Sequence, residues 1–316
     1  MNRNWIEKKI CEKGATQIPS NLKIEEDDEV VRITLNANKI RDKNMQESGN
    51  DFEGWCIATY ACAQKIVIMG VDDEISIDGE YHGIGHLCRF LYRAMKFSEQ
   101  YKWFLLSENL TNEVEKFKSY LHSHKFTNNI GSGEAGNKNN YDDENAVEAK
   151  MAEEGVLRSV VKSIDIGSGK VYRQLPVGLF EDSVSRKNAV FTGGKSAIDL
   201  WSIDGSAINV VELKTNNPMM GIITEVFFYS NYVYDLLMPD GLFTLNDLPK
   251  GNADHRGYEE IWNNRKRINM INGIMLADNE RFHPWIDEEL RTILNDNGLD
   301  VLNYFIESYH LQVIIE

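Results

Sequence analysis

Residues 197–215, AIDLWSIDGSAINVVELKT, constrain the fold of this chain more than any other stretch. The pair Asp204 and Gly205 is a strong signal for the two-residue loop of a β-hairpin, because a type I′ turn needs positive φ at both central positions. A loop made of these two residues would pair Ile203 with Ser206. The stretch therefore predicts two antiparallel strands joined by a tight turn.

This register places polar side chains on one face of the predicted hairpin. Counting outward from the turn sets Asp199 opposite Val210, and alternation along a strand puts Glu212 and Lys214 on the face of Asp199. The diagonal from Asp199 to Glu212 would span about 7–8 Å, close enough for one cation to join both carboxylates. Two acids and an ammonium group on otherwise apolar strands are costly unless they serve a function.

Length and composition are those of a globular protein. The 316 residues are enough for a sizeable core and two domains. The four cysteines show no paired metal spacing, so we expect reduced thiols. The N-terminus lacks a basic region followed by an apolar core, and the apolar runs are too short to span a membrane. We therefore expect a soluble, cytoplasmic protein with no membrane partner.

The net charge of −15 argues against non-specific nucleic-acid binding by bulk charge. Any contact with a nucleic acid would need a local basic patch, a divalent cation or a partner protein. No GxxxxGK loop, dinucleotide-binding fingerprint or Gly-x-Ser-x-Gly motif is present, so ATP hydrolysis is not expected.

A polar stretch at 127–145, TNNIGSGEAGNKNNYDDEN, divides the chain. We expect a small α+β domain of unknown role over 1–126, a linker over 127–143 and a second domain over 144–316. In the first domain, apolar periodicity and β-branched content predict strands at 30–40, 64–71 and 102–108, and helices at 83–95 and 112–124.

The second domain has a regular pattern of elements. Asn216-Asn217-Pro218 is typical of a helix start, with an Asn cap and Pro in the first turn. We expect a helix over 144–164, a strand over 171–180, the hairpin, the helix that follows Pro218, a strand over 268–277, a helix over 284–296, and strands over 301–308 and 310–316.

This order of elements resembles the core of the PD-(D/E)xK nuclease superfamily, the restriction-endonuclease-like fold. The resemblance covers residues 141–316, with Asp199 at the family aspartate and Glu212-Leu213-Lys214 at the (D/E)xK motif. Ile198 stands where the family motif has Pro. The resemblance implies an α/β (α+β) fold whose mixed sheet is flanked by helices.

The resemblance also implies a Mg²⁺-dependent nuclease that hydrolyses phosphodiester bonds, in DNA more than in RNA, with Mn²⁺ able to substitute. Restriction, repair or defence would be its setting. Asp199, Glu212 and the backbone carbonyl of Leu213 would bind the metal, which suits the preference of Mg²⁺ for oxygen ligands. Lys214 would orient the attacking water or stabilise developing charge.

Family members often add a glutamate from the upstream helix. Glu153 and Glu154 are the candidates, and we favour Glu154 because it begins the pattern Glu-x-x-Leu-Arg. Glu225, a polar residue in the apolar helix after the hairpin, is a further candidate to face the site. The pattern Glu148-Ala149-Lys150 also matches Glu-x-Lys, but we interpret it as a solvated helix face.

Local basic clusters are candidates for phosphate contacts: Arg186 and Lys187, Lys195, and Arg265 with its two basic neighbours. Each could equally be an ordinary solvated loop charge. Likewise, Asp199, Glu212 and Lys214 could form a plain salt bridge. A non-enzymatic interaction protein that keeps the fold and acts within a complex is therefore the alternative to a nuclease, and a homodimer is a further possibility.

Overall fold

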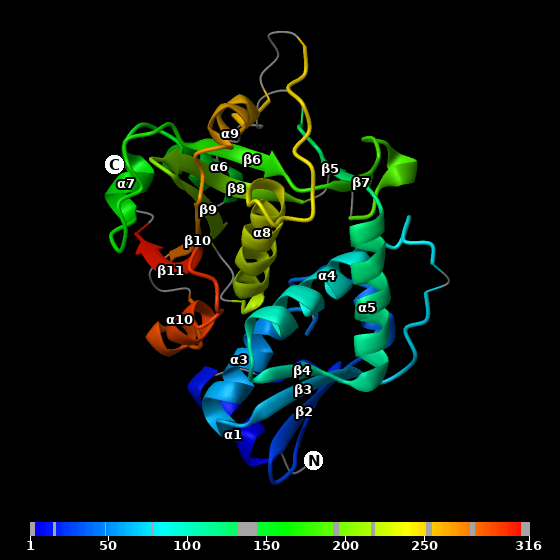
Figure 1. Ribbon diagram of the computed structural model, residues 1–316. Coiled ribbons are helices and arrows are strands. Elements are labelled where there is room, and N and C mark those ends of the chain that lie inside the picture. The colour runs from blue at the N-terminus through cyan, green and yellow to red at the C-terminus, as the bar shows by residue number, and fades with distance from the viewer. Residues whose placement is uncertain are drawn as a thin grey trace. The chain divides into compact units, whose positions relative to one another are not determined.

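The computed structural model describes residues 4–14, 17–47, 49–77, 79–131, 144–191, 196–215, 219–250, 255–278 and 282–310 (Figure 1). It has the mixed α+β architecture expected from the sequence, with parallel and antiparallel strand pairs. The chain divides into two compact units. The first unit comprises 1–124, 219–225 and 283–299, and the second comprises 125–218, 226–282 and 300–316.

The first unit differs from the expected domain 1–126 because two later segments join it. Apolar side chains explain this: Leu290 and Leu294 are buried, and the hydroxyl of Tyr101 donates a hydrogen bond to the carbonyl of Leu294 at 2.8 Å. The indole of Trp285 donates to the carbonyl of Ile10 at 3.0 Å. The segment 283–299 thus packs with N-terminal residues far away in the sequence.

The first unit is built on a four-stranded sheet of order β1-β2-β3-β4, in which only the β1–β2 pair is antiparallel. Its strands are β1 Leu22–Glu26, β2 Val30–Leu35, β3 Ile66–Val71 and β4 Phe104–Leu106. Its helices are α1 Trp5–Gly14, α2 Ala37–Asp42, α3 Phe52–Ala63, α4 Gly85–Gln100, α5 Glu108–Ser123 and α10 Glu288–Asn295.

The second unit holds a five-stranded sheet of order β11-β10-β9-β8-β6. The β6–β8 and β8–β9 pairs are antiparallel, and β9–β10 and β10–β11 are parallel. Its elements are β5 Phe126–Asn128, α6 Glu144–Met151, α7 Val156–Val160, β6 Tyr172–Pro176, β7 Leu179–Glu181, the 3-10 helix η1 Arg186–Asn188, β8 Ala197–Asp204, β9 Ala207–Lys214, α9 Tyr258–Asn264, β10 Met270–Asp278 and β11 Leu302–Tyr309. The helix α8 Gly221–Leu237 begins in the first unit and continues in the second.

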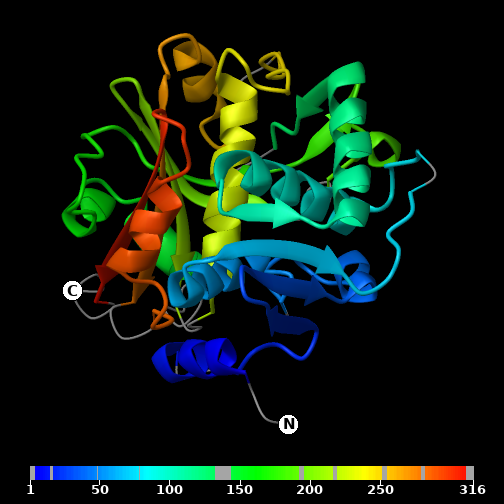
Figure 2. The same cartoon turned by 60° about the horizontal axis from the view of Figure 1, so that its bottom comes forward.

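Helices cover both faces of the five-stranded sheet. On one face, Val147 and Met151 of α6 and Leu157 of α7 form a core with strand residues such as Leu200 and Leu213. On the other face α8 runs beside the strands (yellow in Figure 2), and its Ser230 approaches Gly273 of β10 so closely that a side chain there would collide. Because adjacent strand residues point to opposite faces, this makes a helix–sheet–helix arrangement.

Two predicted elements of the second domain are each divided in the structure. The expected helix 144–164 becomes α6 and α7, because Gly155 adopts a left-handed φ of +78° that interrupts the helix. The expected strand 171–180 becomes β6, which joins the main sheet, and β7, which pairs with β5. Val177 and Gly178 lie between the two strands.

The other boundaries differ in smaller ways. The region 30–40 is a strand followed by α2, and the expected helix 284–296 begins only at Glu288, where Asp287 caps it by accepting a hydrogen bond from the N–H of Leu290. Part of the expected linker is the strand β5. The remaining linker residues 132–143, the helix start at 216–218 and the strand 310–316 beyond His310 lie outside the described residues.

The hairpin forms where the sequence predicts it, but with a different register. Asp204 pairs with Ala207, so the loop consists of Gly205 and Ser206. Only Gly205 has positive φ, +55°, which fits the first central position of a type II′ turn rather than a type I′ turn. The register therefore shifts by two residues, and every side chain keeps the face expected for it.

Among the described helices, none combines the length and apolar character required to cross a bilayer.

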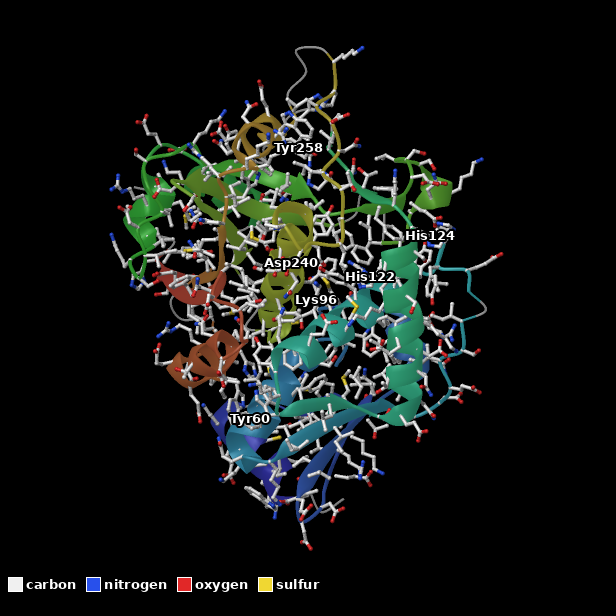
Figure 3. The ribbon with its side chains drawn as sticks, viewed as in Figure 1. Tyr60, Lys96, His122, His124, Asp240 and Tyr258 are labelled. Carbon is white, nitrogen blue, oxygen red and sulfur yellow. The ribbon has the colours of Figure 1, made fainter. Side chains whose placement is uncertain are left out.

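Side-chain hydrogen bonds also fix loops on the second unit. Tyr258, labelled in Figure 3, donates through its hydroxyl to the carbonyl of Asn246 at 2.6 Å.

Candidate functional site

The hairpin places Asp199 next to Glu212. The strand pairing of β8 with β9 ends at Leu200 and Val211, so the next residues, Asp199 and Glu212, stand across from each other. Instead of continuing the pairing, the carboxylate of Asp199 accepts a hydrogen bond from the N–H of Leu213 at 2.9 Å. The two acids are therefore direct cross-strand neighbours, not the diagonal pair expected from the type I′ register.

A third carboxylate comes from Glu144, the first residue of α6. One carboxylate oxygen from each of Glu144, Asp199 and Glu212 lies within 4.8 Å of the other two. Lys214 completes the group: its Nζ lies 2.8 Å from Glu212 and 3.2 Å from Glu144. We refer to these four residues as the acid cluster.

The acid cluster is largely removed from water. Asp199 is 8% and Glu212 2% exposed, whereas Glu144 at 36% connects the group to solvent. Burial raises the pKa of Asp199 well above its ordinary value. The charge of Lys214 and the N–H of Leu213 act in the opposite direction, but the nearby carboxylates of Glu148 and Glu144 raise the pKa further.

Glu148 is a fourth acid, one helical turn after Glu144. Its side chain is buried, which contradicts our interpretation of Glu148-Ala149-Lys150 as a solvated face. Gln174 donates a hydrogen bond to Glu148 at 2.7 Å, and Arg173 lies 3.5 Å from the same oxygen. Burial raises the pKa of Glu148, against the effects of these two donors. The apolar stripe of α6, Val147 and Met151, turns this residue inward.

The donor set suits a hard divalent cation. Among the described residues, with all groups ionised, four carboxylates lie near two cationic side chains, Lys214 and Arg173, so negative charge is in excess. Buried charges of this kind need a counter-charge, and oxygen ligands from one or two carboxylates are what Mg²⁺ uses beside its waters. The residues present thus fit one magnesium or manganese ion.

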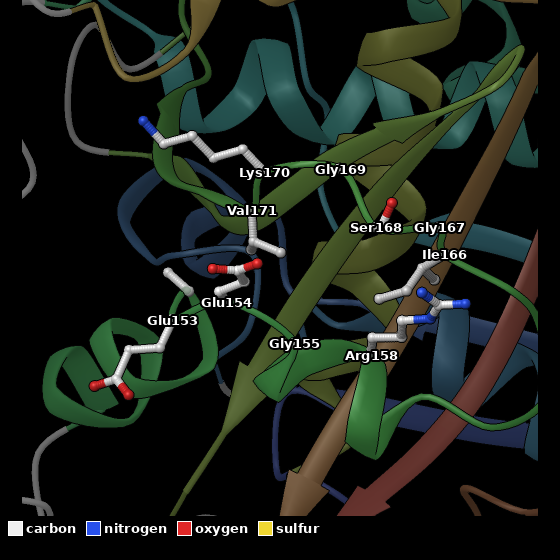
Figure 4. Close-up of a pocket in the computed structure, with 11 residues that line it drawn as sticks. Glu153, Glu154, Gly155, Arg158, Ile166, Gly167, Ser168, Gly169, Lys170 and Val171 are labelled. Carbon is white, nitrogen blue, oxygen red and sulfur yellow. The ribbon is translucent and has the colours of Figure 1, made fainter.

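Glu154 is not part of this group. It is exposed in the turn between α6 and α7, where it lines a separate open cavity of about 520 Å³ with Arg158 and Lys170 (Figure 4). Glu153 lines the same cavity and pairs with Lys150 at 2.7 Å. Of the helix acids, the structure therefore brings Glu144 and Glu148 to the cluster, and not the predicted Glu154 or its alternative Glu153.

The periodicity of α6 was the signal that could have identified these acids. At about 100° per residue, Glu144 and Glu148 lie about 40° apart on one helical face, while Glu154 would lie about 120° from Glu148, on the other side of Glu144, even on a continuous helix. The helix α6 ends at Met151, so Glu154 stands outside it altogether.

The candidate phosphate contacts are distributed over separate loops. Arg186 and Lys187 are exposed in η1, and no hydrogen bond or ion pair links either of them to the acid cluster within the described part of the chain. Arg265 stacks on the ring of Trp262 at 3.8 Å and hydrogen-bonds its carbonyl. Lys195 lies outside the described residues. A phosphate-binding role for these side chains stays a prediction.

The remaining predicted positions have mixed outcomes. Leu213 lies between the metal-binding candidates, and its N–H binds Asp199; metal binding by its carbonyl stays a prediction. Glu225 is buried in the first turns of α8, which belong to the first unit, and its carboxylate faces the side-chain amide of Gln46. Glu225 therefore has a partner of its own in that unit.

Comparisons with protein-family models, with curated proteins and with solved structures find no match to this chain.

Proposed function

We propose that the chain is a Mg²⁺-dependent nuclease whose active site is the acid cluster. The observation that carries this proposal is the set of three carboxylates, from α6, β8 and β9, with oxygens within 4.8 Å of one another and two of the residues buried. The resemblance to the PD-(D/E)xK superfamily, including the restriction-endonuclease-like sheet, supports the same conclusion from the motif Asp199…Glu212-x-Lys214.

In this mechanism Asp199, Glu212 and Glu144 would hold the cation, and the N–H of Leu213 keeps the carboxylate of Asp199 in place. A bound divalent ion would supply charge neutralisation at the phosphate and make a water more acidic. Lys214 is positioned by Glu212 and Glu144 to orient the attacking water and to stabilise negative charge that develops on the phosphoryl oxygens.

The proposed substrate is DNA, with Mn²⁺ able to replace Mg²⁺ and with Arg186, Lys187, Lys195 and Arg265 as candidate backbone contacts. The net charge of −15 disfavours non-specific binding, so a partner protein or a second copy of the chain would assist. A cytoplasmic role in restriction, repair or defence belongs to the same proposal. The alternative, a non-enzymatic interaction protein, is favoured by the acidic charge alone.

The test is cleavage of single-stranded, double-stranded and supercoiled DNA and of RNA, with Mg²⁺ or Mn²⁺, beside calorimetric titration of Mn²⁺. Wild type should cut only with the cation. Asp199→Asn should lose both cutting and Mn²⁺ binding. Lys214→Met should lose cutting by about 10²-fold or more while still binding Mn²⁺, because Lys214 repels the cation rather than ligating it.

Lys150→Met is the matched control, since Lys150 ends the other Glu-x-Lys pattern and pairs outside the cluster with Glu153. It should cut and bind as wild type does. A wild-type protein that neither cuts nor binds Mn²⁺ would support the interaction-protein alternative. Cation binding without cutting of any substrate would refute a nuclease that acts alone and point to a missing partner or activating ligand.

A further inference from the structure

Gln174 has an unusual backbone at the position facing Asp199. In the β6–β8 pairing, Arg173 is opposite Leu200 and Leu175 is opposite Ile198, so Gln174 falls opposite Asp199. Its φ is +57°, in the left-handed region that side-chain-bearing residues rarely adopt, least of all within a strand. Such backbone strain persists only where the surroundings impose it, and it concentrates at functional sites.

The surroundings that impose this conformation come from the loop before α9. The guanidinium of Arg256 donates a hydrogen bond to the carbonyl of Gln174 at 2.9 Å. The next residue, Gly257, lies so close to the ring of Tyr172 that a Cβ there would be 2.2 Å from it. Two consecutive residues of this loop thus contact β6, one at Gln174 and one at Tyr172, and they hold the strained backbone in place.

The left-handed turn of the backbone has a consequence for the side chain. It lets the amide of Gln174 donate to the buried carboxylate of Glu148 at 2.7 Å. Arg173, the preceding residue, reaches the same helix and donates to the carbonyl of Asn145 at 2.8 Å. Two consecutive residues of β6 therefore hold α6, which carries Glu144 as its first residue.

We propose that Gln174 is a positioning residue for the cation site: by holding Glu148 it fixes α6, and with it Glu144, against Asp199 and Glu212. This inference rests on the proposed function. The amide of Gln174 satisfies the buried carboxylate of Glu148 without adding to the positive charge that Arg173 and Lys214 already bring near the cation site.

The experiment compares Gln174→Met with wild type. Methionine keeps the length of the side chain but cannot donate a hydrogen bond. We expect Mn²⁺ affinity, measured by calorimetry, to fall at least about tenfold, as is typical when a partner that orients metal ligands is lost. We expect kcat for DNA cleavage to fall with little change in KM, because Gln174 does not contact the substrate. Gln174→Gly, which also removes the backbone strain, should lose affinity equally while the folded state melts no lower.

Gln64→Met is the matched control. Gln64 is also a glutamine with left-handed φ, +53°, but it lies in the first unit at the end of α3. It should leave Mn²⁺ affinity unchanged. If Gln174→Met and Gln174→Gly both bind Mn²⁺ within twofold of wild type, the positioning role is refuted. If wild type itself binds no Mn²⁺, the proposed function fails first, and the two failures are thereby distinguished.

A double-mutant cycle gives a second measurement. Glu148→Gln and Gln174→Met should each weaken Mn²⁺ binding, and the double variant should be little weaker than the worse single variant, because both act through one hydrogen bond. Effects that multiply as if independent would overturn the assigned role.

Discussion

Each unit buries charged side chains, but the two groups are balanced differently. In the first unit, Glu53 and Arg93 are almost fully buried and joined by two hydrogen bonds of 2.8 and 3.0 Å. Thr224 donates to Glu53, and Arg93 donates to the carbonyl of Asn50. In the second unit, the four carboxylates of Asp199, Glu212, Glu144 and Glu148 lie near two cationic side chains of the described residues, Lys214 and Arg173.

The difference separates a structural role from a functional one. The Glu53–Arg93 pair carries no net charge, and each partner makes a further hydrogen bond within the protein, so the pair needs no cation to balance it. The acid cluster keeps an excess of negative charge at one end of two strands, which weakens the folded state unless protons or a cation compensate. Substitutions in the two groups should therefore change stability in opposite directions.

The largest effect is expected for Glu53→Gln. It leaves the buried guanidinium of Arg93 without its counter-charge, which typically costs about 3–5 kcal/mol. Urea unfolding measures the loss. Replacing both partners, Glu53→Leu with Arg93→Met, should cost less than Glu53→Gln alone, since no charge remains buried. A small loss for Glu53→Gln would contradict the structural role.

Addition of Mg²⁺ or Mn²⁺ should stabilise the wild-type protein by about 1–3 kcal/mol at 10 to 100 times the dissociation constant. The melting temperature should rise accordingly, in Lys150→Met as well, but not in Asp199→Asn. The stabilisation should weaken as the pH falls, because protons compete with the cation for the Asp199 carboxylate. The pKa of Asp199 is raised, so this competition begins at a higher pH than for an ordinary aspartate. A shift that persists in Asp199→Asn would place the cation elsewhere.

In the absence of divalent cations, Asp199→Asn should be more stable than wild type by about 1 kcal/mol at pH 8. The pKa of Asp199 is raised in the folded state, whereas it is about 4 in the unfolded chain. The wild-type carboxyl therefore destabilises the folded state more and more as the pH rises from about 4 through the raised pKa. The difference should vanish below about pH 4. Asparagine still accepts the hydrogen bond from Leu213, so a loss of stability at pH 8 would contradict the charge argument.

The smallest effect is expected for Glu154→Gln. Its side chain is exposed in the turn after α6, so stability should change by less than about 0.5 kcal/mol, and stabilisation by Mn²⁺ should be unaffected. Glu144→Gln, an equally conservative change at the first residue of α6, should reduce that stabilisation. Equal responses in the two variants would refute the placement of Glu144 at the site.

The outcome for the hairpin shows why part of the site could be predicted. The turn uses Gly205 and Ser206 instead of Asp204 and Gly205, which moves the register by two residues. Side chains along a strand repeat every two residues, so Asp199 and Glu212 keep a common face under this shift. A prediction based on alternation therefore stays correct when the turn type is wrong, provided that the register shifts by an even number of residues.

The helix acids show the limit of the same reasoning. A short local pattern favours Glu154 as the helix acid and Glu148 as a solvated residue, but Glu148 is buried and Glu154 is exposed. The sequence of a helix does not show which of its residues will lie next to the sheet. The same holds for 219–225 and 283–299, whose place in the first unit follows from contacts with residues far away in the sequence.

The sequence by itself determined the strands that carry Asp199, Glu212 and Lys214 and the face that these residues share, since both follow from local alternation and one turn. Only the tertiary structure decided that Glu144 and Glu148 join them. Their position depends on the break between α6 and α7, where Gly155 has a left-handed φ, and on the contacts that Gln174 and Arg173 of β6 make with α6. Contacts of this kind join segments that are distant in the sequence, so local patterns do not predict them.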